Sequence, residues 1–145
     1  MSSKVLTFLF VMLCVDVFLP WQALSQEKGD SLTAAVPQQL TLVQAVMCEE
    51  IKEYTPQNQA IVFSIINGKV YCFTSFDPVP EKTVIYHNWF YRDKLTARVK
   101  LSLQPPRWST FSRIQLRDSD KGPWRVEIAD QKGALLRIVR FSITD

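Results

Sequence analysis

The residues of this 145-residue chain that could do chemistry are few, and its only histidine, His87, is the first to consider. An imidazole can serve as the base of a hydrolytic triad or as a metal ligand. The hydroxyls of Ser109, Thr110 and Ser112 would lie near His87 if their strands pair, but no Gly-x-Ser-x-Gly turn exposes them. The Asp and Glu residues show no metal-like spacing. The pattern favours a structural histidine, hydrogen-bonded within a sheet, and predicts no catalytic residue, no metal and no cofactor.

Two pairs of acidic residues, Glu49 with Glu50 and Asp118 with Asp120, resemble the carboxylates of a glycosidase in type. That chemistry needs two carboxyl groups fixed across a cleft. Both pairs fall in predicted loops, with nothing in the pattern to make them face each other. They are interpreted as solvated charges.

Aromatic residues are numerous for a small domain, and a row of exposed rings is one way in which a binding module stacks on a sugar or docks a partner. The rings concerned are Tyr86, Trp89, Tyr91, Trp108, Phe111 and Trp124. The alternative is that these rings fill the core, as one tryptophan does in many immunoglobulin-like domains.

Trp89 and Trp124 lie on strongly patterned runs and are assigned to the core. Trp108, which follows Arg107 and two prolines, is the better candidate for a binding site. If Trp108 or Tyr91 is exposed beside an arginine, that edge could hold a glycan or a peptide. The candidate binding residues are therefore Trp108, Arg107, Tyr91 and His87.

The N-terminus has the pattern of a secretory signal peptide. Lys4 precedes an apolar run over residues 5–19, and Ala23-Leu24-Ser25 fits the small-x-small cleavage rule. The alternative is a retained membrane anchor, but the run is short for a span and Asp16 interrupts it. The prediction is a signal peptide over residues 1–25 and a polar, flexible tether over residues 26–39. A periplasmic or extracellular domain then covers residues 40–145, with no stable membrane span after cleavage.

Export changes how the cysteines are interpreted. Once Cys14 leaves with the signal peptide, Cys48 and Cys72 form an even pair in an oxidising compartment, which predicts a disulfide. Closing this loop would contribute on the order of 3 kcal/mol in the chain-entropy model. Two buried free thiols in neighbouring strands are the alternative.

Residues 83–91, the run that holds His87, are β-branched or aromatic almost throughout and predict a central strand. The Asn67-Gly68 pair lies between two β-rich runs and predicts a hairpin with a type I′ turn. Eight β-rich runs in all are separated by turn or proline signals: residues 40–48, 60–66, 69–76, 83–91, 95–103, 108–116, 123–128 and 135–143. There is no long helical period, so we expect an antiparallel β-sandwich of about eight strands and immunoglobulin-like size.

Several segments resemble the bacterial DUF2914 family of exported domains. Residues 85–89, which contain His87-Asn88-Trp89, and residues 122–127, which contain Gly122-Pro123-Trp124-Arg125-Val126, are the most specific. Residues 70–74, 107–112 and 130–133 follow the same order, and the resemblance extends from about Val43 to the C-terminus. It implies a small exported β domain without an established activity, and it supplies no catalytic residues.

These observations bound the function. The formal net charge is only +3, and basic residues alternate with acidic ones, so nothing favours nucleic-acid binding. The leading hypothesis is a non-catalytic module that binds an envelope protein or a cell-wall glycan. The alternatives are a hydrolase that uses His87 with a nearby hydroxyl or metal, and a purely architectural domain.

Overall fold

The computed structural model describes residues 36–145. The predicted signal peptide and residues 26–35 of the predicted tether lie outside the described residues. Residues 36–39 are exposed and precede the first strand. Among residues 36–145, no helix is long and apolar enough to cross a membrane.

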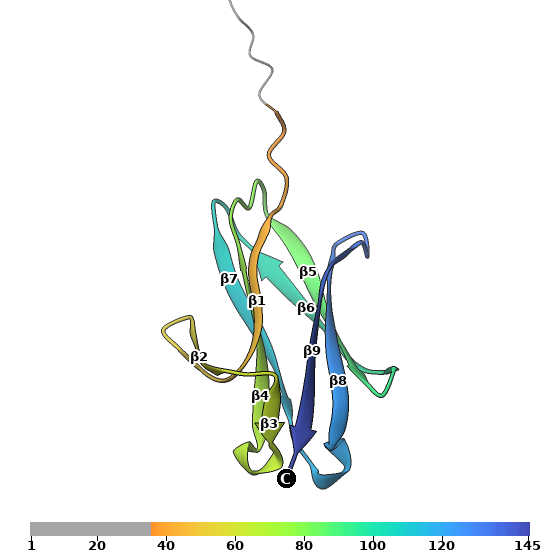
Figure 1. Cartoon of the computed structure of the whole chain (residues 1–145). Coiled ribbons are helices and arrows are strands. Elements are labelled where there is room, and N and C mark those ends of the chain that lie inside the picture. The colour runs from red at the N-terminus through yellow and green to blue at the C-terminus, as the bar shows by residue number, and fades with distance from the viewer. Residues whose placement is uncertain (1–35) are drawn as a thin grey trace, which may run out of the picture. The chain divides into compact units, whose positions relative to one another are not determined.

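The described chain is built from strands, with two short 3-10 turns, η1 and η2, between them (Figure 1). The elements are β1 (Leu42–Lys52), β2 (Thr55–Gln59), β3 (Val62–Ser64), η1 (Ile65–Asn67), β4 (Lys69–Phe76), β5 (Thr83–Tyr91), β6 (Lys94–Leu103), β7 (Trp108–Gln115), η2 (Asp118–Asp120), β8 (Gly122–Asp130) and β9 (Leu135–Thr144). The predicted all-β fold is confirmed, with nine strands rather than eight. The extra strand is β2, whose Pro56 lies on an edge strand, where proline is tolerated.

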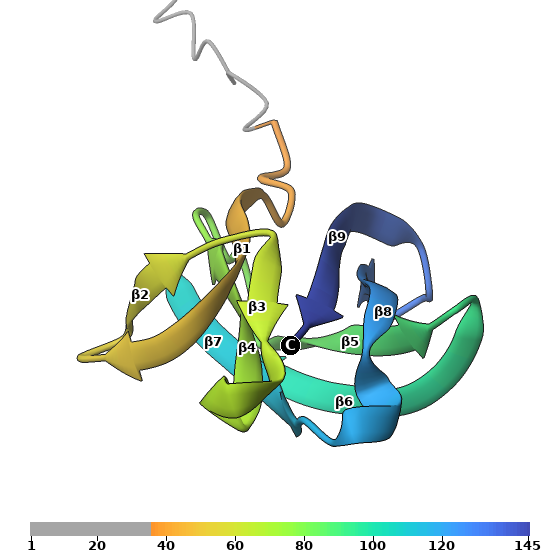
Figure 2. The ribbon, with the colours of Figure 1, turned by 60° about the horizontal axis from the view of Figure 1, so that its bottom comes forward.

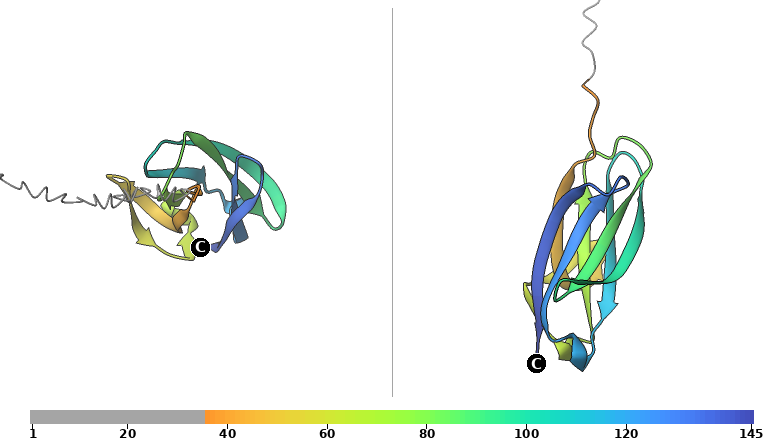
Figure 3. Two further views of the ribbon diagram at one scale, coloured as in Figure 1. Left: turned by 90° about the horizontal axis from the view of Figure 1, so that it is seen from above. Right: turned by 90° about the vertical axis from the view of Figure 1, so that its right-hand side faces the viewer.

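The strands form two sheets that pack as a sandwich. Sheet A has the order β2-β1-β4-β7, and sheet B has the order β3-β9-β8-β5-β6. In Figure 2, β1, β4 and β7 lie on one side and β5, β6 and β8 on the other. All pairs are antiparallel except β3 with β9, which are parallel. The strands run along the long axis, and the C-terminus lies at the opposite end from the entry into β1 (Figure 3).

The predicted central strand β5 is confirmed, because it pairs with β6 on one side and β8 on the other. Its alternate residues Ile85, His87 and Trp89 are fully buried between the sheets. Trp89 and Trp124 both pack near Phe141, so their predicted core positions are confirmed. The apolar side chains on the inner faces of both sheets supply the main hydrophobic stabilisation.

The hairpin predicted at Asn67-Gly68 is wrong. Strand β3 pairs with β9 in sheet B, whereas β4 pairs with β1 and β7 in sheet A, so the chain crosses between the sheets at this point. Gly68 has a positive φ of 70°, but Asn67 ends the 3-10 turn η1 instead of forming the first corner of a type I′ turn. The Asn67 side chain donates to Glu49 Oε1 at 2.7 Å, which ties the crossing to β1.

The predicted disulfide between Cys48 and Cys72 is absent, and both thiols are free and buried. The strand register gives the reason. Cys72 lies opposite Met47 in the β1–β4 pair, so Cys48, the next residue along β1, faces the other side of the sheet. Cys72 belongs to the core between the sheets, whereas Cys48 packs with Tyr71 and Phe73 on the outer face of sheet A.

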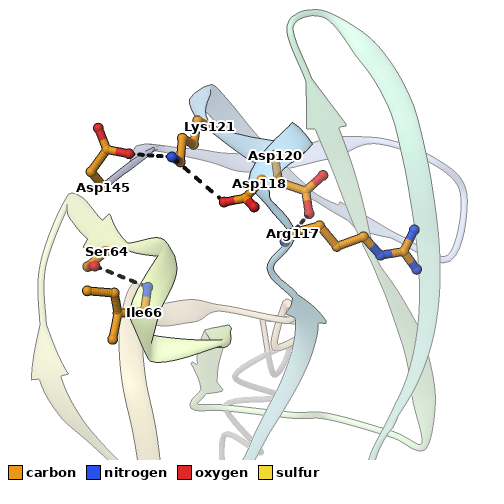
Figure 4. A network of polar contacts seen from close by, with 7 residues as sticks. All are labelled: Ser64, Ile66, Arg117, Asp118, Asp120, Lys121 and Asp145. Carbon is orange, nitrogen blue, oxygen red and sulfur yellow. Dashed lines mark hydrogen bonds and ion pairs between the residues drawn. The ribbon is translucent and has the colours of Figure 1, made fainter.

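The end of the sandwich near the C-terminus is closed by polar contacts (Figure 4). Lys121 binds the side chains of Asp145 and Asp118, and the Arg117 backbone N–H donates to Asp120 Oδ2 at 2.7 Å. The acidic pair Asp118 and Asp120 thus lies in a 3-10 turn rather than across a cleft.

Candidate functional site

His87 lies at the centre of a buried chain of hydrogen bonds that joins the two sheets, which we call the His87 chain. Its members are Trp89, Ser112, His87, Thr74 and the carbonyl of Thr110. Ser112 Oγ lies 3.0 Å from Trp89 Nε1 and 2.8 Å from His87 Nδ1. On the other side of the ring, Thr74 Oγ1 lies 3.2 Å from His87 Nε2 and 3.4 Å from the Thr110 carbonyl oxygen. His87 and Trp89 come from sheet B, and the other groups come from sheet A.

The donors and acceptors of the His87 chain assign one tautomer. Thr74 gives its single hydroxyl proton to the Thr110 carbonyl, so it must accept from His87 Nε2–H. Ser112 accepts from the Trp89 indole N–H and therefore has its own proton free to donate to His87 Nδ1. Every group is satisfied with a neutral imidazole, as buried polar groups require.

The environment holds His87 in this neutral state. Burial removes the water that would stabilise an imidazolium and lowers the pKa of His87 to about 3. A second proton on Nδ1 would also remove the acceptor for the hydrogen bond that the Ser112 hydroxyl donates to this nitrogen. His87 is therefore neutral near neutral pH.

Access to His87 from solvent is also absent, because the residue has no exposed surface. The buried position of His87 agrees with the prediction of a structural, hydrogen-bonded histidine. It does not agree with the prediction that His87 is a binding residue. Among residues 36–145, no group of three or more His, Cys, Asp or Glu side chains is placed to hold a metal ion. Burial raises the pKa of the Cys48 thiol to about 11 and also raises that of Cys72, so neither is a ready nucleophile.

A cleft of about 480 Å³ lies at the N-terminal end of β7, and we call it the Trp108 cleft. Its walls come from β1, the β1–β2 turn, the end of β4 and the start of β7: Val43, Tyr54, Ser75, Phe76, Asp77, Arg107, Trp108 and Ser109. Trp108 is 39% exposed, against 0% for Trp89 and 7% for Trp124. Trp108 is thus the tryptophan of the described chain that offers a ring to a ligand.

Polar groups border the aromatic wall of the Trp108 cleft. Ser75 and Ser109 are direct neighbours in the β4–β7 pair, and both line the cleft. The Arg107 and Asp77 side chains are 3.9 Å apart, both exposed, and such a surface ion pair is weak enough to rearrange around a ligand. The two loops that carry them are joined by a hydrogen bond from Val79 N–H to the Pro106 carbonyl at 2.7 Å, which holds the cleft's rim together.

Tyr54 reaches this cleft from the tip of the β1–β2 hairpin, which projects to one side of the sandwich (Figure 1). Glu53 and Tyr54 form the turn with φ values of 48° and 56°. Such values are uncommon for residues with side chains and concentrate at functional positions. No local pattern points to Tyr54, because residues 49–54 have the composition of a charged connector and nothing near them in the sequence shows where the tip of the hairpin lies.

Tyr91, the remaining candidate, is far from the cleft in the fold. It lies at the end of β5, its hydroxyl donates to the Lys121 carbonyl at 2.7 Å, and its ring packs against Trp124 at a centroid distance of 4.8 Å. Arg107 and Trp108 thus line the same cleft, and the structure separates both from Tyr91 and His87.

Comparison with protein families gives one match. Residues 82–143, from the start of β5 almost to the end of β9, match the family model DUF2914, a protein of unknown function. Residues 82–143 are thus similar to the DUF2914 family. The resemblance drawn from the sequence is confirmed over this range, and it covers β5 to β9 with His87 and Trp108. The DUF2914 match leaves out β1 to β4.

No curated protein matches the chain. Among solved structures, a similar chain is that of a mutant (D270A) β-glucosidase from Listeria innocua in complex with laminaribiose, with 10% sequence identity and a TM-score of 0.43. The likeness covers 74% of this chain and 16% of that chain, so this protein spans a small fraction of the enzyme's length. A TM-score this low supports no conclusion about the fold or the function of this protein.

Proposed function

We propose that this protein is a non-catalytic, exported binding module whose Trp108 cleft binds a polysaccharide of the cell envelope. The observation that carries the proposal is the half-exposed Trp108 ring at the wall of a cleft of about 480 Å³. A ligand site is typically a concave, largely apolar surface with a few placed polar groups. The Trp108 cleft has this composition.

The chemistry of the cleft suits a sugar. A pyranose ring has an apolar C–H face, which can stack on an aromatic ring, and a rim of hydroxyls that need hydrogen-bond partners. Trp108 and Tyr54 offer the rings, and Ser75 and Ser109 offer adjacent hydroxyls. Arg107 and Asp77 add a donor and an acceptor that are both exposed. A peptide would be held by the same rings, but the paired hydroxyls and the ion pair favour a hydroxyl-rich ligand.

The location rests on the sequence pattern of residues 1–25, which predicts export and therefore contact with envelope polymers. The hydrolase alternative has weaker support. His87 and Ser112 are close together, but the imidazole is buried and neutral and already uses both nitrogens within the fold. A purely architectural role gives no reason for an open cleft with an exposed tryptophan.

The test is retention on insoluble cell-wall polysaccharide. The protein, purified after expression of the full chain, is incubated with the polymer and the bound fraction is measured for wild type, Trp108→Ala and Phe111→Ala. Phe111 is a matched control, because it lies on the same strand and is 37% exposed, yet it does not line the cleft. We expect Trp108→Ala to lower the affinity by roughly tenfold or more, as loss of a stacking ring typically does in binding sites, and Phe111→Ala to retain it.

Two outcomes would contradict the proposal. Equal losses in both variants would mean that exposed aromatic rings bind the polymer without a site. No retention of the wild type on any wall polymer, together with capture of an envelope protein that depends on Trp108, would assign the cleft to a protein partner instead.

A further inference from the structure

The β5–β6 turn lies on the opposite side of the sandwich from the β1–β2 hairpin (Figure 1). Residues of this turn line a second, smaller pocket. Its volume is about 130 Å³. Three arginines, Arg92, Arg125 and Arg140, line it together with Phe90, Asp93 and Trp124. We call it the arginine pocket. It is too small for a sugar ring and its partner groups, and its lining is dominated by cations.

The arginines lie close together in spite of the repulsion between their positive charges. Arg125 and Arg140 lie directly opposite each other in the β8–β9 pair, and like charges in this position destabilise a sheet. The acidic groups nearby, Asp93 and Glu127, both bind Arg125. Arg92 and Arg140 have no ion-pair partner within residues 36–145. The three guanidinium groups are therefore accompanied by only two carboxylates, and both carboxylates bind Arg125.

Neighbouring rings and turns hold the cations in place. The Arg125 guanidinium lies 4.1 Å from the centroid of the Phe90 ring, and that of Arg92 lies 5.2 Å from the Tyr91 ring. Arg92 and Asp93 form the turn with φ values of 45° and 65°, in the left-handed region that side-chain-bearing residues seldom adopt. The turn thus positions one cation and one carboxylate at the mouth of the pocket at a local cost in backbone energy.

We propose that the arginine pocket binds an oxyanion, the phosphate, sulfate or carboxylate group of an acidic ligand, and that the Asp93 carboxylate occupies its place until the ligand arrives. A guanidinium presents paired N–H donors that match the oxygens of such groups. The Asp93 side chain is 91% exposed, so its ion pair with Arg125 is readily exchanged. An incoming oxyanion would bind Arg125 where Asp93 does and would also neutralise Arg92 and Arg140. This site is independent of the Trp108 cleft.

The test uses the purified full-chain product in a buffer without phosphate or sulfate. Sodium phosphate, sodium sulfate and sodium acetate are titrated separately, with sodium chloride adjusted to keep the ionic strength constant. Backbone amide NMR shifts are followed, and so is the thermal unfolding midpoint. We expect saturable shifts confined to residues near positions 92, 93, 125 and 140, and a rise in the midpoint with the anion that binds best. The three salts distinguish which oxyanion the pocket prefers.

Three variants sharpen the result. Arg140→Ala should lower the affinity roughly tenfold, because it removes a charge-assisted contact, and should not lower the unfolding midpoint in anion-free buffer, because it relieves the repulsion with Arg125. Asp93→Asn removes the competing carboxylate, tolerates the left-handed turn, and should raise the affinity several-fold. The matched control is Arg113→Ala, at an exposed arginine on β7 outside this pocket, which should leave the affinity for the anion unchanged.

Shifts that do not saturate, or equal effects of Arg140→Ala and Arg113→Ala, would show general charge screening and overturn the proposal. A lower or unchanged affinity in Asp93→Asn would overturn the assigned role of Asp93.

Discussion

Strand β7 contributes to two regions that use similar residue types in opposite ways. At its start, Trp108 and Ser109 line an open cleft. Three residues further on, Ser112 is buried and joins His87 to Trp89. Both regions combine a tryptophan with a serine, but in the His87 chain each polar atom has a partner inside the protein, whereas in the cleft the ring and the hydroxyls face solvent.

The difference teaches that residue type alone does not identify a site. A satisfied buried chain contributes to stability and to the choice of a single packing arrangement, and it leaves nothing for a ligand. An open group costs little to expose and keeps its bonding capacity for a partner. Substitutions should therefore separate the two regions by what they damage, which is folding for the His87 chain and binding for the cleft.

The largest effect is expected from His87→Ala. The change leaves a cavity and deprives Ser112 and Thr74 of their partner, so the free energy of unfolding should fall by about 3 kcal/mol or more. Urea unfolding followed by circular dichroism measures it. A loss below about 1 kcal/mol would mean that the His87 chain does not stabilise the sandwich, and the contrast with the cleft would fail.

A matched pair of serines on β7 gives the next effect. Ser112→Ala leaves the Trp89 indole N–H and His87 Nδ1 without their partner, which should cost about 2 kcal/mol of unfolding free energy. Ser109→Ala, at the cleft, should cost about 0.5 kcal/mol or less, as expected for a surface position. Equal losses in the two variants, measured by the same urea titration, would show that burial does not separate these regions.

Acid should weaken the fold through protonation of His87. The unfolded imidazole takes up a proton near its ordinary pKa of 6.5, whereas the buried one does so only near pH 3. Between these values the unfolded state binds more protons than the folded state. The contribution of His87 to the free energy of unfolding is therefore fully present above pH 6.5 and is lost as the pH falls below that value. The expected loss between pH 7.5 and pH 5 is about 2 kcal/mol.

The control for this pH dependence is His87→Asn, which has no group to titrate in that range, since the chain contains a single histidine. Its unfolding free energy should change little between pH 7.5 and pH 5. The same slope in the variant as in the wild type would assign the pH dependence to other groups and contradict the neutral, buried imidazole.

A small effect on stability is also expected at Trp108, whose replacement by alanine should change the unfolding free energy by about 1 kcal/mol or less because the ring is partly solvated already. Its exposure is measured directly by acrylamide quenching of variants that keep one tryptophan each, the others being phenylalanine. Trp108 should be quenched readily, and Trp89 and Trp124 should be protected. Protection of all three would remove the main support for a binding cleft.

The sequence by itself determined the local elements of this protein. The β-branched and aromatic composition of residues 83–91 predicted β5, prolines at positions 78, 80, 105 and 106 marked the breaks, and the patterned runs placed Trp89 and Trp124 in the core. It also selected Arg107 and Trp108 as neighbours of interest. Each of these follows from the backbone geometry of a strand or from a ring that cannot donate a hydrogen bond, which are properties of a few adjacent residues.

Only the tertiary structure decided which elements meet. The Asn67-Gly68 turn does not make a hairpin, because β3 and β4 are recruited into different sheets. Ser112 reaches His87 across the two layers rather than between paired strands. The cleft gains Tyr54, and three arginines converge at the β5–β6 turn. Strand pairing and sheet packing join residues far apart in the chain, and their choice depends on the total burial of both faces, which no local pattern contains.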